Sequence, residues 1–271
     1  MNSNSDILYV TVLYKQRLEE TSAFKTLLHD RAHVYIQDNS PEPIIPDSLP
    51  AGWKYVSASS NPGLSAAYNA AARFAMEKGL KWLMITDQDT IYPEGAASVY
   101  ETLPQRFPEE KIFFPKVVLP NGMYISPVSK RHYLSSPQPE PLKGHVELSK
   151  SAIINSGLLI NLAAFEESGG YNEKVFLDFS DFQFIDCFSQ ICPTGYVVDE
   201  EIRQSFSAVD DKGDAQLKRF LLFCKSLNGY DKRKLRTRIG IGLVVLKRCL
   251  SLTLRLRTFD AIKIFIKNYM R

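Results

Sequence analysis

Residues 81–90, Lys-Trp-Leu-Met-Ile-Thr-Asp-Gln-Asp-Thr, join a short apolar run to two aspartates separated by one residue. An apolar run of this length, bounded by polar residues, is typical of a buried β-strand. Side chains two residues apart on an extended chain point the same way, so Asp87 and Asp89 can converge at the carboxyl end of the strand. Ligands of open α/β sheets bind at that end. The stretch therefore predicts a site for a divalent cation, Mg²⁺ or Mn²⁺, because such ions prefer carboxylate oxygens.

The same aspartates have a simpler interpretation. Asp89 and Thr90 could begin a helix, since Pro93 stands where a first helical turn tolerates proline. The motif alone does not decide between a cation site and a helix start, so the rest of the chain has to be considered.

Strands and helices are expected to alternate on the amino-terminal side of this stretch, which predicts a parallel α/β sheet. After it, Asn121-Gly122 favours a hairpin turn, and residues 126–150 are rich in Pro and Ser and are expected to form a mobile loop. The expected strands are 7–13, 34–36, 53–56, 82–87, 111–119 and 196–198, and the expected helices are 18–28, 64–75, 179–191 and most of the chain after 214.

Composition bounds the class of protein. The chain has 271 residues, 45% of them apolar and 23% charged, as in an ordinary globular protein. Its net charge of +3 is unevenly distributed, because residues 215–271 contain 15 Lys or Arg but 2 Asp or Glu. We therefore predict an α/β domain over residues 1–210 and a basic helical extension over 211–271 that contacts a polyanion.

Three further segments carry polar residues toward the same edge of the sheet. Asp38 ends the second strand and can accept a hydrogen bond from a pyrimidine imide; alternatively it forms an Asx-turn. Asn61 and Gly63 open a helix whose amino terminus favours anions, or they form a plain cap. Asn69 lies inside an Ala-rich helix, where Asn has poor propensity.

The third segment follows Gly169-Gly170, which indicates a sharp turn. Asp178 and Asp181 lie near the expected start of a helix, where the helix dipole favours carboxylates. One interpretation gives them no chemistry beyond that. The other makes one of them a general base.

The motifs follow one another in a recognisable order. Together they resemble glycosyltransferase family 2, inverting enzymes with the GT-A fold, over about residues 7–207. The Asp-Gln-Asp-Thr stretch and residues 176–181, Phe-Leu-Asp-Phe-Ser-Asp, look most like the bacterial rhamnosyltransferases that use dTDP-L-rhamnose to build O-antigens and capsules. The motifs are Thr11 with Tyr14, Asp38-Asn39-Ser40, Asn61-x-Gly63-x5-Asn69, Asp87-Gln88-Asp89, Asn155-Ser156-Gly157 and Gly169-Gly170-Tyr171-Asn172-Glu173.

The resemblance implies a role for each motif. Asp181 would be the catalytic base, with Asp178 as second choice, and Asp89 would ligate the cation with Asp87. Asn155, Ser156 and Gly157 would lie near the sugar and the acceptor. The nucleotide sugar would contact Thr11, Tyr14, Asp38, Asn61, Gly63, Asn69 and Asp87.

The implied reaction moves a sugar from a nucleotide-diphosphate donor, L-rhamnose from dTDP-rhamnose in the first place, to a hydroxyl of a lipid-linked surface-polysaccharide intermediate. One carboxylate base suffices, because a cation can stabilise the departing diphosphate, whereas hydrolases use two carboxylates. The donor could instead be a UDP-hexose or a UDP-N-acetylhexosamine. A sugar-nucleotide pyrophosphorylase would need a glycine-rich loop after the first strand, and residues 14–17 contain no glycine.

Two departures from the family pattern weaken the assignment of the donor. Many relatives carry a late histidine at the metal or diphosphate, but the last histidine here is His145 and the corresponding region is Arg203-Gln204-Ser205-Phe206-Ser207. Ser205, Asp210 or Asp211 could substitute for it. An acid often follows the base by two residues, where this chain has Gln183. A non-catalytic sugar-nucleotide-binding subunit is therefore a further alternative.

The basic extension predicts where the protein is found. Residues 230–257 and 261–269 interleave Lys and Arg with Ile, Leu and Val, a pattern that favours helices lying on an anionic membrane. The alternative is helices packed on the domain with a solvated cationic face. Aromatic platforms and known nucleic-acid modules are lacking, so no nucleic-acid partner is expected.

The remaining sequence features favour a cytoplasmic protein. The N-terminus lacks the features of a signal peptide, and no apolar run reaches the length of a membrane span. The four cysteines form no C-x-x-C pair, which favours free thiols over a zinc site. We expect a cytoplasmic protein, peripheral at the inner face of the cytoplasmic membrane.

Overall fold

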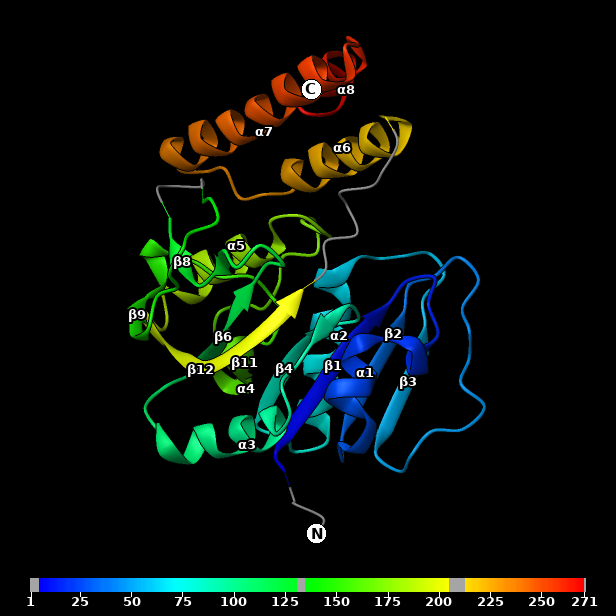
Figure 1. Ribbon diagram of the computed structural model, residues 1–271, viewed down its shortest axis with the longest axis vertical. Helices are drawn as coiled ribbons and strands as arrows, with labels where there is room; N and C mark the ends of the chain where they lie inside the picture. Colours follow the sequence, from blue (N-terminus) through cyan, green and yellow to red (C-terminus); the bar gives the residue numbers. More distant parts are fainter. Residues whose placement is uncertain (1–4, 131–134, 205–212, 271) are drawn as a thin grey trace.

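The strand that ends at Asp87 lies inside a ten-stranded sheet in the computed structural model, which describes residues 5–130, 135–204 and 213–270 (Figure 1). The strand order is β3-β2-β1-β4-β11-β6-β12-β5, with β7 paired to β6 and β9 to β12. The strands are β1 (Ile7–Leu13), β2 (Val34–Asp38), β3 (Trp53–Ser57), β4 (Trp82–Asp87), β5 (Thr90–Ile91), β6 (Ile112–Val118), β7 (Tyr124–Ser126), β9 (Gly144–Glu147), β11 (Leu159–Asn161) and β12 (Thr194–Gln204).

Pairing within the sheet is mixed but mainly parallel in its central strands. β1 pairs parallel with β2 and β4, and β2 with β3. β6 also pairs parallel with β12. β11 is antiparallel to both of its neighbours, β4 and β6. The predicted α/β class with a mainly parallel sheet is confirmed.

Helices cover both faces of the sheet, and alternation along the strands explains why. Leu8 and Val10 of β1 pack in a cluster with α2 and α5, whereas Tyr9 and Leu13 pack on the other face with α3. The helices are α1 (Ser22–Thr26), α2 (Leu64–Glu77), α3 (Ala96–Arg106), α4 (Leu162–Glu167), α5 (Ser180–Phe188), α6 (Gly213–Asn228), α7 (Leu235–Leu256) and α8 (Asp260–Asn268).

The last three helices lie together at one end of the molecule (Figure 1). They share a separate apolar cluster with Val175. Ser226 Oγ of α6 accepts a hydrogen bond from the Leu177 N–H at 3.3 Å, and Asn172 Nδ2 donates to the Gly229 carbonyl at 3.0 Å. The extension is therefore docked on the segment that precedes α5. The expected boundary at residues 210 and 211 falls outside the described residues.

Two local predictions were wrong, and one alternative interpretation is excluded. Residues 18–28 form a single turn (Leu18–Glu20) and then the short α1, because the Thr21 hydroxyl accepts the Phe24 N–H at 3.1 Å and starts a new helix. Thr90 begins β5 instead of a helix. Within residues 126–150, the expected loop contains β9 and also β8 (Val128–Ser129), which pairs with β10 (Ser151–Ala152).

Within residues 5–130, 135–204 and 213–270, no helix is both long enough and apolar enough to cross a membrane. All four cysteines are free thiols.

Gly63 is the position at which the fold depends most directly on glycine. Its φ of +94° and ψ of 178° lie in a region open almost only to glycine, and a Cβ there would overlap the Phe176 carbonyl oxygen. The Leu64 N–H donates to that same oxygen at 2.7 Å. The close approach that Gly63 permits is thus to the chain's own backbone.

We expect Gly63→Ala to lower the free energy of unfolding by about 2–4 kcal/mol, as measured by chemical denaturation. Gly79→Ala is the matched control, because Gly79 also has a positive φ (+73°) but nothing within 4 Å of the added Cβ. Its cost should be about 1–2 kcal/mol. Equal losses in the two variants would contradict the role of the Phe176 contact.

Candidate active site

Asp87 is the point at which three distant segments meet. Its Oδ1 accepts a 3.5 Å hydrogen bond from Tyr68 Oη of α2, and its Oδ2 accepts from Gln204 Nε2 at 3.2 Å at the end of β12. Ser156 Oγ, just before β11, also donates to Oδ2. The carboxylate is thereby fixed at the carboxyl end of β4, where the sequence predicts a ligand site.

Asp89 lies close to this carboxylate. Burial, followed by the negative charge of Asp87, raises the pKa of Asp89 to about 6. Burial also raises the pKa of Asp87, against the hydrogen bonds from Ser156, Tyr68 and Gln204. Burial is the main cause of both shifts, so the two carboxylates are partly withdrawn from water and a nearby positive charge would stabilise their ionised forms.

These residues fit a hard divalent cation. Beside the two carboxylates, Gln204 Oε1 and Thr90 Oγ1 are buried and have no hydrogen-bond partner within the described residues, and the two residues are paired between β12 and β5. Among those residues no group of three or more His, Cys, Asp or Glu could hold a metal ion. A cation with two carboxylates suits a Mg²⁺-type site that is completed by substrate phosphates and water.

Asp181 lies in the first turn of α5. Burial raises its pKa to about 7; the Phe182 N–H, at 2.8 Å, opposes this shift, and the charges of Asp178 and Asp87 add to it. The rings of Tyr68 and Tyr171 have centroids 5.2 Å apart. The charges of Asp87 and Asp181 both contribute to the raised pKa values of these two hydroxyls. Asp181 is therefore part of the same site and is suited to proton transfer near neutral pH.

Asp178 is held differently. Its Oδ1 forms an ion pair with Arg219 Nη2 of α6 at 2.7 Å, and its other oxygen is buried without a hydrogen-bond partner in the described part of the chain. The cation of Arg219 offsets its charge, so Asp178 is a weaker candidate for the base than Asp181.

The motif Asn155-Ser156-Gly157 is held in place by hydrogen bonds to two tyrosine hydroxyls. Asn155 Oδ1 accepts the Tyr171 hydroxyl at 2.6 Å, and the Gly157 carbonyl accepts the Tyr100 hydroxyl at 2.9 Å. The chain in this motif thereby presents Ser156 to Asp87.

The residues predicted for the nucleoside are not equally accessible. Tyr14 is 44% exposed, and its N–H donates to Gln88 Oε1 at 2.9 Å. Thr11 and Asp38 are fully buried. The Asp38 carboxylate accepts the N–H groups of Ser40 at 2.9 Å and Ile44 at 3.0 Å, and the Tyr55 hydroxyl at 2.8 Å. Asp38 therefore organises the loop that follows β2, as the Asx-turn alternative supposed.

The side chain of Asn69, predicted to contact the nucleotide sugar, is hydrogen-bonded to other residues of the protein. Asn69 Nδ2 donates to the Tyr171 carbonyl at 2.9 Å and to Glu173 Oε1 at 3.0 Å, and its Oδ1 accepts the Tyr171 N–H at 2.9 Å. Asn61, exposed and with a φ of +49°, precedes Gly63 in the turn. Asn69 thus holds the turn that leads to Asp181, which explains an asparagine in an Ala-rich helix.

Sequence reasoning missed Gln204 as a site residue. Its amide hydrogen-bonds both Asp87 and Asp89, and it lies in the region where relatives carry the late histidine, which was the available signal. The predicted substitutes Ser205, Asp210 and Asp211 lie outside the described residues.

Gln183 is buried and accepts a hydrogen bond from Asn172 Nδ2 at 3.2 Å.

Known proteins resemble this chain in sequence and in fold. No protein-family model matches the chain. The dTDP-rhamnosyl transferase RfbF of Shigella flexneri is 26% identical over 184 residues, a match that covers 66% of this chain and 61% of RfbF.

Solved structures share the fold at low sequence identity. TarS of S. aureus, solved as residues 1–349, has a TM-score of 0.51 at 11% identity, and the match covers 93% of this chain and 92% of that 1–349 chain. The mannosyltransferase PcManGT of Pyrobaculum calidifontis, in complex with GDP-Man and Mn²⁺, has a TM-score of 0.52 at 10% identity, covering 98% and 75% of the two chains. The chain has the fold of the GT-A glycosyltransferases, and the resemblance to these enzymes recognised in its sequence is confirmed.

Proposed function

We propose that the protein is a metal-dependent inverting glycosyltransferase that moves a sugar from a nucleotide diphosphate to an acceptor hydroxyl. One observation carries the proposal: a carboxyl with a pKa of about 7, Asp181, shares a site with the paired carboxylates Asp87 and Asp89. A base and a cation site together provide what such a transfer requires. The similarity to a dTDP-rhamnosyl transferase supports the same reaction class.

Each residue has a defined part in this reaction. Asp87 and Asp89 would hold a divalent cation, which supplies positive charge to the departing diphosphate. Gln204 and Ser156 orient Asp87 through their hydrogen bonds. Asp181 accepts the proton of the attacking hydroxyl. Attack on the face opposite the diphosphate inverts the configuration of the anomeric carbon.

The sequence match and the surface of α7 support a more specific proposal for the substrates. L-rhamnose from dTDP-rhamnose is the proposed donor on the strength of the match to RfbF, with a UDP-hexose or UDP-N-acetylhexosamine as the alternative. The proposed acceptor is a lipid-linked intermediate of a bacterial surface polysaccharide. The protein would then work at the inner face of the cytoplasmic membrane, because α7 exposes leucines beside Lys and Arg side chains.

The experiment that tests this function is nucleotide release from a panel of donors, each with and without a lipid-linked acceptor extract. The panel contains dTDP-rhamnose, UDP-glucose, UDP-galactose, UDP-N-acetylglucosamine and GDP-mannose. We expect release from one donor that requires Mg²⁺ or Mn²⁺ and acceptor. Release that persists in chelator would contradict the cation site. Nucleotide binding without release from any donor would favour the non-catalytic subunit.

A further inference from the structure

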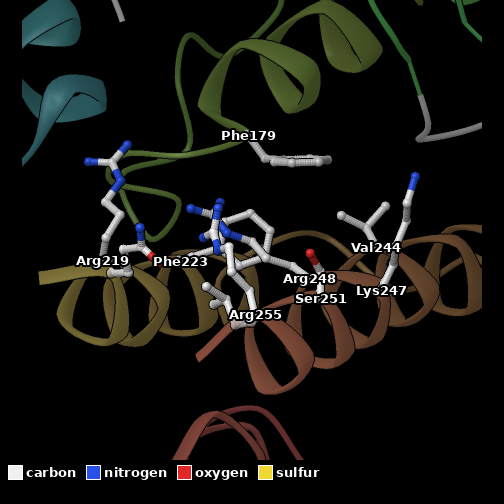
Figure 2. A pocket seen from close by; sticks show the side chains of 10 residues that line it. Phe179, Arg219, Phe223, Val244, Lys247, Arg248, Ser251 and Arg255 are labelled. Atoms are coloured by element: carbon white, nitrogen blue, oxygen red, sulfur yellow. The ribbon is translucent and has the colours of Figure 1, made fainter. Parts of the chain in front are cut away.

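A cationic pocket lies between the start of α5 and the helices α6 and α7. It has a volume of about 440 Å³. Phe179, Arg219, Lys247, Arg248 and Arg255 are among its lining residues (Figure 2). Four basic side chains from two helices thus surround one cavity, which Phe179 covers from the α5 side.

The positive charge of this pocket is poorly balanced. Arg219 is paired with Asp178, but within residues 5–130, 135–204 and 213–270 no carboxylate forms an ion pair with Lys247, Arg248 or Arg255. Burial lowers the pKa of Arg248; the charge of Asp178 opposes this shift, and the charges of Arg219 and Arg255 add to it. Like charges held together in this way favour a bound anion.

The basic residues that line the pocket come from two helices, α6 and α7, so they can contact an anion from more than one side. The Arg248 guanidinium lies 4.2 Å from the centre of the Phe223 ring, which fixes its plane. Lys247 and Arg255 are exposed at the mouth of the pocket. Guanidinium groups bind phosphate through paired hydrogen bonds.

The pocket adjoins the proposed base along the chain. Phe179 has a left-handed φ of +68° and caps α5, so its ring leaves the helix toward the pocket while Asp181 lies in the helix's first turn. The Phe179 ring contacts Phe223 of α6 edge-on, with ring centres 5.9 Å apart. A molecule anchored in the pocket therefore lies on the Asp178–Asp181 side of the active site, where the proton acceptor is.

An exposed apolar stripe of α7 borders the pocket. Leu243 precedes Lys247 by four residues, and Leu250 and Leu254 follow it by three and seven, so all four share one side of the helix. These leucines are 55%, 49% and 79% exposed. A cationic cavity beside an apolar stripe is complementary to an amphiphile with an anionic head.

We propose that this pocket binds the diphosphate that links the acceptor to its lipid carrier, with the hydrocarbon chain along the leucine stripe of α7. The proposal rests on the proposed function for the identity of the acceptor. It assigns to the basic extension a direct role in holding the acceptor, beyond a general attraction to membranes.

The test is the binding of farnesyl diphosphate, inorganic diphosphate and farnesol to the full chain by isothermal titration calorimetry, with no sugar nucleotide present. The variant is Lys247→Gln with Arg255→Gln, two exposed pocket residues. The matched control is Lys218→Gln with Lys267→Gln, two exposed residues of the extension that do not line the pocket. Both variants lose the same charge.

We expect the pocket variant to weaken farnesyl diphosphate binding at least about 10-fold, and the control less than about 2-fold. Farnesyl diphosphate should also bind more tightly than either inorganic diphosphate or farnesol. Equal affinities for the two diphosphates would identify a site for a soluble anion and overturn the lipid assignment. Equal weakening in both variants, or no binding by wild type, would overturn the pocket.

The assay distinguishes this proposal from the proposed function. Because it contains no donor, a chain that binds farnesyl diphosphate in the expected way but releases no nucleotide would contradict only the transferase. A chain that transfers sugar but binds farnesyl diphosphate equally in all variants would contradict only the pocket.

Discussion

Asp181→Asn is expected to reduce sugar transfer by about 10²–10⁴-fold, the usual contribution of a general base. The asparagine keeps the shape of the side chain but cannot accept the acceptor's proton. Steady-state rates with the donor identified in the panel measure the loss, and donor binding should be unchanged. Asp178→Asn is the matched control on the same segment, and it should retain most activity because Asp178 is paired with Arg219.

The same residue predicts the pH dependence of the reaction. A base with a pKa of about 7 must lose its proton to act, so kcat/KM should rise as the pH increases toward 7 and then level off. The rise should persist in Asp178→Asn. A pH-independent rate in wild type, or full activity in Asp181→Asn, would contradict the assignment of the base.

The stability of Asp181→Asn should change in the opposite direction to its activity. A raised pKa means that the folded protein binds the Asp181 proton more tightly than the unfolded chain does, so this group's contribution falls as the pH rises from about 4 to 7. Asparagine avoids the cost of the buried charge. We expect a melting temperature higher by about 2–6 °C at pH 8, and no gain at pH 4.

Asp89→Asn is expected to abolish the response of the protein to divalent cations. In wild type, Mn²⁺ at about 100 times its Kd should stabilise the fold by about 2.7 kcal/mol, because the cation offsets the repulsion between Asp87 and Asp89. Thermal unfolding with Mn²⁺ and with chelator measures this stabilisation. Transfer should fall by at least about 10²-fold in the variant, as it should for wild type in chelator.

Asp199→Asn is the control for this experiment. Its side chain is 97% exposed and pairs with Lys116, so the substitution removes a carboxylate from the surface. It should leave both the Mn²⁺ response and the transfer rate unchanged. An undiminished Mn²⁺ response in Asp89→Asn would contradict the cation site.

Several features of the protein could be predicted because their signals are local. The apolar run before Asp87 specifies a buried strand, whereas Asp89 lies in the turn that follows the strand and not on the extended chain itself. The Asn121-Gly122 turn joins β6 and β7 because Asn121 Oδ1 accepts the Met123 N–H at 3.1 Å. Such signals require only neighbours in sequence.

Other signals were visible in the local sequence, but their meaning depended on partners far away along the chain. Asn69 was assigned to the donor because asparagine is unfavourable in a helix, yet its amide is occupied by Tyr171 and Glu173, more than a hundred residues away. Gly63 permits a close approach, but the approaching group is the Phe176 carbonyl. The residue type indicated a constraint without identifying the partner.

The sequence by itself determined the alternating α/β elements, the paired aspartates at a strand end and the basic extension, because each depends on spacing along the chain. Only the tertiary structure distinguishes the environments of the two candidate bases, since Arg219 of α6 forms an ion pair with Asp178 while burial raises the pKa of Asp181. It also brought Gln204 to Asp87 across 117 residues. Burial and charge pairing depend on which distant segments pack together, and spacing along the chain does not contain that information.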